Sequence, residues 1–415
     1  MRAIQFKKMK RIVSIAYEKS AFYREYYEKK GFYPGMLESY EDIAKIPIVR
    51  REMLKETASE RILTVSNTQR LHMHTTSGSS GIPVHYYYST KEDLVKNYGV
   101  LRSYINMGMR LTDTTVALRD PIDIRKPGLL ERIGLLAYDY YNIYDPIEQT
   151  YQSLNEKYQV IDVLKGMPSD LLNLCQTIRM HGGIFPRVKL LISDSEVLDS
   201  LARVYIQTTI GTEILDWYGS VENGCIAYQL KGSDKYILNE DQILVENGSL
   251  EGFMGDAIIT NLNNSVFPTI RYQIGDVIDF GDGKSELPGI SRKTIDQIQG
   301  KYLDFILLAD GTVISPHVPK QELTHMPGIK RFQIMQRASD DILIKIEKDN
   351  NYTEETEERI ISTMRDVFQG KAHCSIEYDD TLSIKSGYRK FKVIESKIAQ
   401  EFLSAQSTKD SEEKR

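Results

Sequence analysis

The middle of the chain, from about residue 91 to residue 217, alternates between segments of helical periodicity and short apolar runs. The expected helices are 91–107, 169–180 and 198–208, and the expected strands are 115–118, 188–192 and 214–217. A chain that alternates in this way folds into a largely parallel sheet covered by helices, because each parallel connection must cross back over the sheet. We therefore expect an α/β architecture here.

The pattern changes in the second half of the chain. From Tyr236 to Phe280, short strand-like runs are separated by Gly, Asn and Asp turns, which is typical of an antiparallel or barrel-like segment. Past Gly300 the order is strand, strand, helix, strand, which fits a compact α+β domain of roughly one hundred residues. We therefore expect a large domain over residues 1–299 and a small one over residues 300–403.

The two ends of the chain differ in character. Apolar residues recur at helical spacing from Ile4 to Tyr27, and Gly31 and Pro34 end this segment. Such an amphipathic helix suits a homodimer contact as well as the core, so both alternatives stay open. Residues 404–415 are polar and charged, and we expect them to be a disordered tail.

Composition narrows the class of protein. The chain has 415 residues, 41% hydrophobic and 27% charged, with a net charge of -5. This balance indicates a folded, soluble protein without the basic footprint of a nucleic-acid binder. The longest apolar runs are too short to span a membrane, and the N-terminus lacks the apolar core of a signal peptide. Three cysteines lie far apart and support no disulfide framework, so a reducing cytoplasm is expected.

The stretch from Thr75 to Pro83 contains five hydroxyl side chains and two glycines between two strand-like runs. Backbone N–H groups and hydroxyls in such a loop can converge on a polyphosphate, and glycine permits a close approach. The alternative is an ordinary surface turn. The loop lacks the lysine and the spacing of a Walker motif. The candidate phosphate-binding residues are Thr76, Ser77, Gly78, Ser79, Ser80 and Gly81.

Three further short motifs follow in order: Tyr218–Glu222, Arg271–Asp276 and Gly300–Asp304. Together with the hydroxyl loop, their order and separations resemble the adenylate-forming enzymes, and in particular the phenylacetate–CoA ligase-like branch. That branch includes capsule-biosynthesis adenylating proteins. The resemblance runs from about residue 10 to residue 400. It implies a large N-terminal domain of mixed and parallel sheets flanked by helices, with a barrel-like segment, and a small α+β domain that closes over it.

The resemblance assigns roles within the large domain. Glu222 is the expected Mg²⁺ ligand and a catalytic residue, since a carboxylate oxygen suits this hard ion; the alternative is an exposed turn glutamate. Asp276 is expected to bind the ribose hydroxyls, although Gly275–Asp276 also reads as a hairpin corner. Tyr218 resembles the aromatic residue on which the adenine stacks, and a tyrosine of the core is the equally good alternative. Gly219 and Ser220, which follow it, are expected to belong to the same nucleotide site.

In the small domain, two lysines stand out. Lys301 occupies a position where the family usually has arginine, so it keeps the charge but loses the bidentate fork. Lys390 precedes Phe391 in a segment that resembles the one carrying the catalytic lysine, and we select it over Lys385 and Lys392. A basic surface loop is the alternative. Such a lysine would stabilise negative charge between the acid and the α-phosphate.

The sequence also departs from the family. Ser193–Glu196 stands where Gly-Gly-Glu is common, and side chains there are expected to narrow the adenine or acid pocket. Trp217 and the tyrosines of 138–144 are further candidates to border that pocket. Many phenylacetate-type members carry a cysteine cluster after the second motif, whereas this chain has only Cys225, which argues against bound zinc.

These observations predict an ATP- and Mg²⁺-dependent, AMP-forming enzyme. It would convert a small, possibly aryl, carboxylic acid into an acyl-adenylate and transfer the acyl group to CoA. Transfer to an amine or hydroxyl in capsular polysaccharide or secondary metabolism is the alternative. A non-catalytic nucleotide-binding scaffold is the reading from a different class. The identity of the acid cannot be read from spacing.

Overall fold

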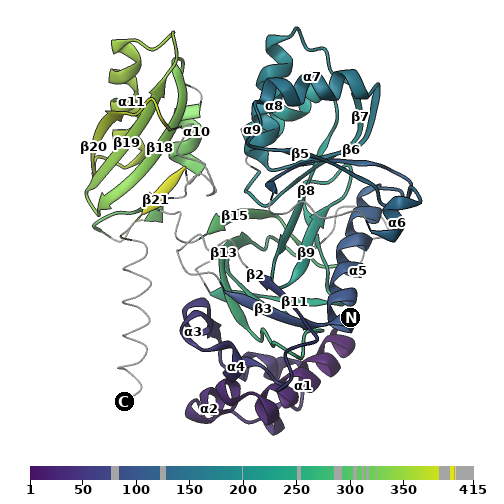
Figure 1. Cartoon of the computed structure of the whole chain (residues 1–415). Coiled ribbons are helices and arrows are strands. Elements are labelled where there is room, and N and C mark those ends of the chain that lie inside the picture. The colour runs from purple at the N-terminus through teal and green to yellow at the C-terminus, as the bar shows by residue number, and fades with distance from the viewer. Residues whose placement is uncertain are drawn as a thin grey trace. The chain divides into compact units, whose positions relative to one another are not determined.

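The computed structural model describes residues 1–75, 84–121, 128–198, 200–249, 254–284, 292–301, 306–310, 313–314, 317–324, 326–382, 393–396 and 398. Two compact units are present (Figure 1). The first comprises Met1–Ile274 and Ile278–Ile298, and the second comprises Gly275–Val277 and Gln299–Arg415.

The first unit is built on an eight-stranded sheet of order β14-β10-β9-β8-β7-β6-β4-β5. Its parallel strands are β4 (Thr115–Arg119), β5 (Tyr138–Asn142), β6 (Val160–Gly166), β7 (Arg187–Asp194) and β8 (Ile214–Ser220). The antiparallel strands are β9 (Gly224–Gln229), β10 (Tyr236–Leu238) and β14 (Thr294–Ile295). The predicted parallel sheet is therefore present, and its parallel part ends at β8.

Helices cover both faces of this sheet (Figure 1). On one face, α7 (Ile147–Lys157), α8 (Pro168–Met180) and α9 (Ser200–Ile210) form an apolar core with the parallel strands. On the other face, α5 (Thr90–Met107) packs through Tyr104 and Met107 on Val163, Ile192 and Leu215. A short helix, α6 (Leu129–Arg132), precedes β5.

The sequence of α8 explains its bounds. Pro168 stands at the first helical position, where its fixed φ suits the helix and its missing N–H is not needed. Leu171, Leu174, Cys175 and Ile178 recur at intervals of three or four residues and are fully buried. The helix ends before Gly182 and Gly183, which both adopt positive φ.

A second sheet has the order β1-β13-β12-β11, with β15 paired to β13. Its strands are β1 (Val49–Arg50), β11 (Ile243–Ser249), β12 (Met254–Asn261), β13 (Tyr272–Asp279) and β15 (Gln297–Lys301). β11 and β12 are antiparallel as predicted, but β1 pairs with β13 in parallel. A separate hairpin joins β2 (Leu71–Thr75) and β3 (His85–Ser89).

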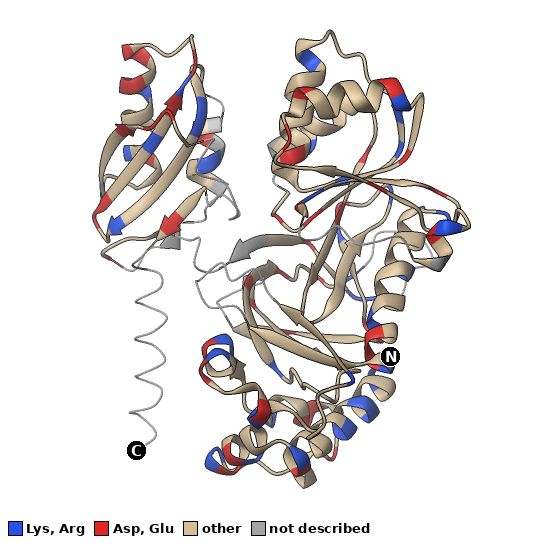
Figure 2. Cartoon of the chain, viewed as in Figure 1, with Lys and Arg blue, Asp and Glu red and all other residues tan. Residues whose placement is uncertain are grey.

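The N-terminal helix is divided at Ser20 into α1 (Arg2–Lys19) and α2 (Ala21–Lys29). The Ser20 hydroxyl accepts a hydrogen bond from the Tyr23 N–H and so caps α2. Met9, Ile12 and other residues of α1 are buried in the chain's own core, whereas most of its lysines and arginines are exposed (Figure 2). Lys8 is the exception, because its Nζ donates to the backbone oxygen of Asp241 and to Oδ1 of Asn263. Short helices follow at η1 (Pro34–Met36), η2 (Tyr40–Lys45), α3 (Arg51–Glu56) and α4 (Ser59–Ile62).

The second unit contains a four-stranded sheet of order β20-β19-β18-β21. Its elements are β16 (Ile306–Leu307), β17 (Val313–Ile314), α10 (His317–Thr324), β18 (Ile329–Ala338), β19 (Asp341–Lys348), α11 (Glu354–Val367), β20 (His373–Tyr378) and β21 (Ile394–Ser396). The predicted strand–strand–helix–strand order is present in β18, β19, α11 and β20. Ile344, Ile360 and Met364 are fully buried in a core of its own.

Candidate active site

The carboxyl ends of the parallel strands carry a buried group of charged side chains, the Arg119–Asp194–Lys165 cluster. Nη1 and Nη2 of Arg119 donate to the two carboxylate oxygens of Asp194 at 2.9 and 2.6 Å. Nζ of Lys165 lies 2.9 Å from Oδ2 of Asp194. The side chains of Arg119, Lys165 and Asp194 are 16%, 9% and 5% exposed. The cluster therefore joins β4, β6 and β7 at one edge of the sheet.

Burial and charge pairing oppose each other in this cluster. Burial raises the pKa of Asp194, but Lys165 and Arg119 outweigh it and hold that pKa well below its usual range. Burial lowers the pKa of Lys165 to about 8, against the attraction of Asp194. Lys165 is thus still largely protonated at pH 7. The cluster then holds two cations and one carboxylate.

Aromatic side chains on the α5 side cover the ammonium group. Nζ of Lys165 donates to the hydroxyl of Tyr104. It also lies 4.2 Å from the ring centroid of Tyr104 and 5.6 Å from that of Trp217. Nε1 of Trp217 donates to Oγ of Ser103 in α5 at 2.8 Å. Trp217, a candidate to border the acid pocket, therefore lies beside Lys165.

A second buried carboxylate, Asp216, lies next to Trp217 in β8. The hydroxyls of Ser193 and Tyr236 donate to it. Burial raises the pKa of Asp216 to about 6, even though both hydrogen bonds and Arg203 favour the charged form. Since side chains alternate along a strand, Asp216 and Trp217 serve opposite faces of the sheet.

The β8–β9 turn carries the Tyr218–Glu222 motif. Glu222 is only 3% exposed, so the alternative of an exposed turn glutamate was wrong. Its backbone carbonyl accepts hydrogen bonds from the hydroxyl of Tyr88 and from Nδ2 of Asn261. Burial, and next the negative charge of Glu222, raise the pKa values of Tyr86 and Tyr272. The Glu222 carboxylate thus lies close enough to Tyr86 and Tyr272 to act on their hydroxyl groups.

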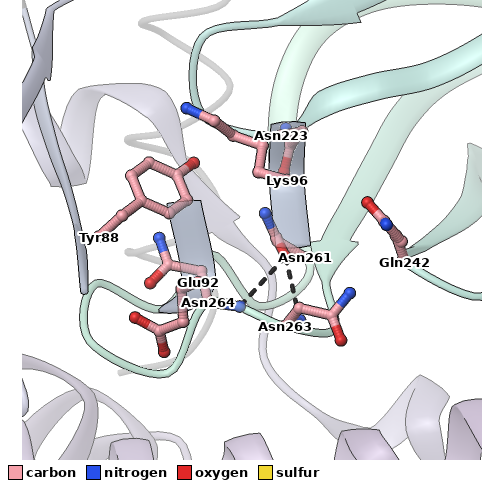
Figure 3. A pocket seen from close by; sticks show the side chains of 8 residues that line it. All are labelled: Tyr88, Glu92, Lys96, Asn223, Gln242, Asn261, Asn263 and Asn264. Carbon is pink, nitrogen blue, oxygen red and sulfur yellow. Dashed lines mark hydrogen bonds between the residues drawn. The ribbon is translucent and has the colours of Figure 1, made fainter. Parts of the chain in front are cut away.

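A small polar pocket lies behind this turn and is lined by Tyr88, Glu92, Lys96, Asn223, Gln242, Asn261, Asn263 and Asn264 (Figure 3). Oδ1 of Asn261 accepts from the backbone N–H groups of Asn263 and Asn264 at 3.0 and 3.2 Å. Nζ of Lys96 lies 4.2 Å above the ring of Tyr88. The pocket walls are tied to one another, and they hold the Glu222 carbonyl through Tyr88 and Asn261.

Within the motif, Gly219 is required by space. A Cβ at residue 219 would lie 2.3 Å from Cη2 of Trp217 and 2.5 Å from the carbonyl oxygen of Gly224. Tyr218 is 9% exposed and packs in the main core. Ser220 ends β8, and its hydroxyl accepts from Nδ2 of Asn223 at 3.1 Å. The motif and the Arg119–Asp194–Lys165 cluster thus share one sheet edge.

The other predicted residues fall elsewhere or outside the described part of the chain. Asp276 lies within β13 and is partly buried, and Lys301 is the last residue of β15. Thr75 and His85, which flank the hydroxyl loop, pair with each other across the hairpin. The loop residues Thr76, Ser77, Gly78, Ser79, Ser80 and Gly81, and the lysines Lys385, Lys390 and Lys392, lie outside the described residues.

The side chains of Ser193–Glu196, which are expected to narrow the pocket, make polar contacts in the structure. The hydroxyl of Ser193 donates to the carboxylate of Asp216, and the carboxylate of Asp194 accepts from Arg119 in the charged cluster. Ser195 adopts φ 70°, a value more common for glycine. Oε2 of Glu196 accepts from the Ser169 N–H at the start of α8, at 3.1 Å.

Sequence reasoning missed Arg119 and Lys165. Each lies at or near the carboxyl end of its strand, which is the position where ligands bind in parallel sheets. That rule, applied to every expected strand, would have found Arg119. It would have found Lys165 only if β6 had been predicted.

The donor chemistry of Glu222 fits a metal bound through nucleotide phosphates. No group of three or more His, Cys, Asp and Glu residues that could hold a metal is present among the described residues. Mg²⁺ on a nucleotide needs only one or two protein carboxylates, because phosphates and water supply the other oxygens. The single buried carboxylate of Glu222 is sufficient for that role.

Known proteins resemble this chain in sequence and in fold. Residues 306–397 match the CapK C-terminal domain. Over 391 residues the chain is 22% identical to the phenylacetate–coenzyme A ligase of Pseudomonas putida, covering 87% of this chain and 85% of that protein. The solved structure of 2-hydroxyisobutyryl-CoA ligase in the postadenylation state, in complex with R3-HIB-AMP, superposes with TM-score 0.74 at 20% identity. It covers 97% of this chain and 91% of that one.

An open conformation of the same ligase, in complex with 2-HIB-AMP and CoA, gives TM-score 0.62 at 20% identity and covers 90% of this chain and 87% of that one. The chain therefore has the fold of these adenylate-forming ligases. In sequence it is similar to phenylacetate–CoA ligases over most of its length, and its residues 306–397 match the CapK C-terminal domain. Among the described helices, none is long and apolar enough to cross a membrane.

Proposed function

We propose that the protein activates a small carboxylic acid with ATP, forming an acyl-adenylate and pyrophosphate, and then transfers the acyl group to CoA. The observation that carries this proposal is the buried Glu222 turn, which continues the strand edge bearing the Arg119–Asp194–Lys165 cluster. A nucleotide motif and a polar cluster on the same edge suit a site for two substrates, since ligands bind at the carboxyl ends of parallel strands.

The residues have separate tasks in this reaction. Glu222 would hold Mg²⁺, and the ion would supply positive charge to the phosphates. The hydroxyl loop, Thr76 to Gly81, donates to the β- and γ-phosphates. Asp276 accepts from the ribose hydroxyls, and Lys301 adds a positive charge beside them. Tyr218 contacts the adenine, and Lys390 stabilises charge between the acid and the α-phosphate.

Pyrophosphate release tests this proposal directly. The full-length protein is incubated with ATP, Mg²⁺ and a panel of aryl, short-chain and hydroxy acids. We expect release with at least one acid and thioester formation when CoA is added. Glu222→Gln and Lys390→Ala are expected to lose release, whereas Lys157→Met, at an exposed lysine paired with Asp139, keeps it. Release with none of the acids, together with no protection by ATP against thermal unfolding, contradicts the proposal.

A second acceptor is favoured by one observation, the match of residues 306–397 to the CapK C-terminal domain. The small domain of an adenylating enzyme takes part in the second half-reaction, so a capsule-type domain favours transfer to an amine or hydroxyl of a sugar. The two acceptors are distinguished by supplying the acyl-adenylate formed in situ with CoA in one reaction and with amino sugars in another. A thioester product supports CoA, and an amide or ester supports the alternative.

A further inference from the structure

We propose that Asp93 and Lys96, one turn apart in α5, are positioning residues for the nucleotide site. They connect β2, the strand that precedes the hydroxyl loop, with the turn that carries Glu222. Neither residue is assigned a contact with substrate. Both act by fixing the backbone of the two segments that are proposed to hold the phosphates and Mg²⁺. This inference rests on the proposed function and adds two residues to it.

The first half of the link joins α5 to β2. Oδ1 of Asp93 lies 2.9 Å from Nε2 of His74 in β2 and 3.3 Å from Nζ of Lys96. Thr75 follows His74 as the last residue of β2, and the proposed phosphate-binding residues begin at the next position, Thr76. Asp93 therefore holds β2 at a residue that is two positions from the start of the phosphate-binding segment.

The second half of the link runs from α5 to the Glu222 turn. Nζ of Lys96 lies 4.2 Å from the ring centroid of Tyr88, and an ammonium above an aromatic face is attracted by the ring. The hydroxyl of Tyr88 donates to the backbone carbonyl of Glu222. His74 packs edge-on against the same ring, with the two ring centroids 5.4 Å apart. The ring that holds the Glu222 carbonyl is therefore itself held from α5 and from β2.

The alkyl chain of Lys96 also packs on the backbone that follows Glu222. Gly224 adopts φ 70°, and a Cβ there would lie 2.7 Å from Cγ of Lys96. The turn thus approaches α5 more closely than a side chain at residue 224 permits. Asn223, between these two residues of the turn, lines the same polar pocket as Lys96 (Figure 3). Lys96 therefore contacts the turn directly as well as through Tyr88.

The burial of Lys96 distinguishes it from an ordinary lysine on a helix surface. Its side chain is 10% exposed, whereas Lys91 of the same helix is exposed. Burial lowers the pKa of Lys96, and the negative charge of Asp93 opposes that change. A buried ion pair gives little net stability over apolar side chains of similar volume. The role assigned to the Asp93–Lys96 pair is accordingly geometric.

The affinity for ATP tests the inference. Protection of the full-length protein against thermal unfolding is measured with ATP in excess Mg²⁺ and no acid. Lys96→Met keeps the alkyl chain and removes the charge. It is expected to weaken the apparent affinity for ATP by about 10- to 100-fold, the usual effect of removing a residue that orients a metal ligand. Lys96→Arg, which keeps a cation for the ring, should recover most of this affinity. Lys91→Met is the matched control and should bind ATP as the wild type does.

Two further measurements separate positioning from a merely structural role. In pyrophosphate release, Lys96→Met is expected to raise the KM for ATP and to leave the KM for the acid unchanged. Asp93→Asn should produce the same pattern, and it serves as the second variant if Lys96→Met does not fold. A structural role alone would lower the unfolding temperature of the free protein without changing its affinity for ATP.

Failure of this inference differs from failure of the proposed function. If ATP protects the wild type and pyrophosphate is released, but Lys96→Met and Asp93→Asn keep the wild-type affinity for ATP, the positioning role is overturned and the proposed reaction stands. If ATP does not protect the wild type and no acid gives pyrophosphate release, both are overturned.

Discussion

The carboxylate of Asp194 accepts hydrogen bonds from both terminal nitrogens of Arg119, at 2.9 and 2.6 Å, and Nζ of Lys165 contacts Oδ2 of the same carboxylate. Asp194 is therefore the only anion between two cations that lie on neighbouring strands in this described cluster. Its removal and the removal of Lys165 should have opposite consequences for stability.

Asp194→Asn is expected to lower the free energy of unfolding by about 3–5 kcal/mol, because it leaves two buried cations without their carboxylate. Lys165→Met is expected to leave that free energy unchanged or raised, because it removes a buried charge and keeps the Arg119–Asp194 pair. Urea unfolding measures both. Glu25→Gln, at the exposed ion pair with Arg61, serves as the control and should change stability by less than about 1 kcal/mol. If Asp194→Asn and Lys165→Met lowered the free energy of unfolding equally, Asp194 would not be the shared partner that stabilises both cations.

Asp216 gives a pH dependence with a definite sign. Its pKa is about 6 in the folded protein, above the usual value of about 3.9 in an unfolded chain. The folded state therefore binds more protons between these values. The stability contributed by Asp216 is fully present below about pH 4 and is lost as the pH rises through about 6.

Asp216→Asn removes this titration. The difference in unfolding free energy between the variant and the wild type should move by about 2–3 kcal/mol in favour of the variant from pH 4 to pH 7. Urea unfolding at both pH values measures it. A difference that is constant with pH would mean that the Asp216 carboxyl titrates normally in the folded chain.

Gly219→Ala is expected to destabilise the protein by about 1–3 kcal/mol and to reduce pyrophosphate release. The added Cβ would meet the ring of Trp217 and the backbone oxygen of Gly224, and the backbone cannot give way easily. Gly35→Ala is the matched control, because nothing lies within 4 Å of a Cβ there. Thermal unfolding and pyrophosphate release are both measured. Equal behaviour of the two variants would show that the β8 end has room for a side chain.

Metal removal should weaken nucleotide binding. The proposed function has the hydroxyl loop, Thr75 to Pro83, hold phosphates without a fixed charge of its own, because this stretch contains no lysine or arginine. We expect EDTA to abolish most of the thermal protection that ATP gives, and Glu222→Gln to do the same with Mg²⁺ present, by on the order of tenfold in apparent affinity. Protection by ATP that is insensitive to both changes would assign the metal to other ligands.

Local patterns predicted several elements well. The helix α8 begins at Pro168 and ends before Gly182 because proline and glycine restrict the backbone directly, and its buried residues repeat at helical spacing. The predicted order of β18, β19, α11 and β20 in the small unit rests on the same kind of local periodicity. Such features depend on residues that are close in sequence.

Other elements were not predicted. The helix α7 contains few buried residues, namely Thr150, Tyr151 and Leu154, so its apolar stripe is short. The strand β6 includes Asp162 and Lys165, which interrupt its apolar run. Both elements form because they pack against neighbouring strands and helices of the parallel sheet. Sequence periodicity does not predict this tertiary packing.

The sequence by itself determined the alternation of helices and strands, the order of the four motifs and the family to which they point. Only the tertiary structure decided that Glu222 is buried and that Arg119 and Lys165, distant in sequence, both contact the carboxylate of Asp194. The physical reason is that backbone preferences act between near neighbours. The charge and burial of a site depend on which strand ends the parallel sheet brings together.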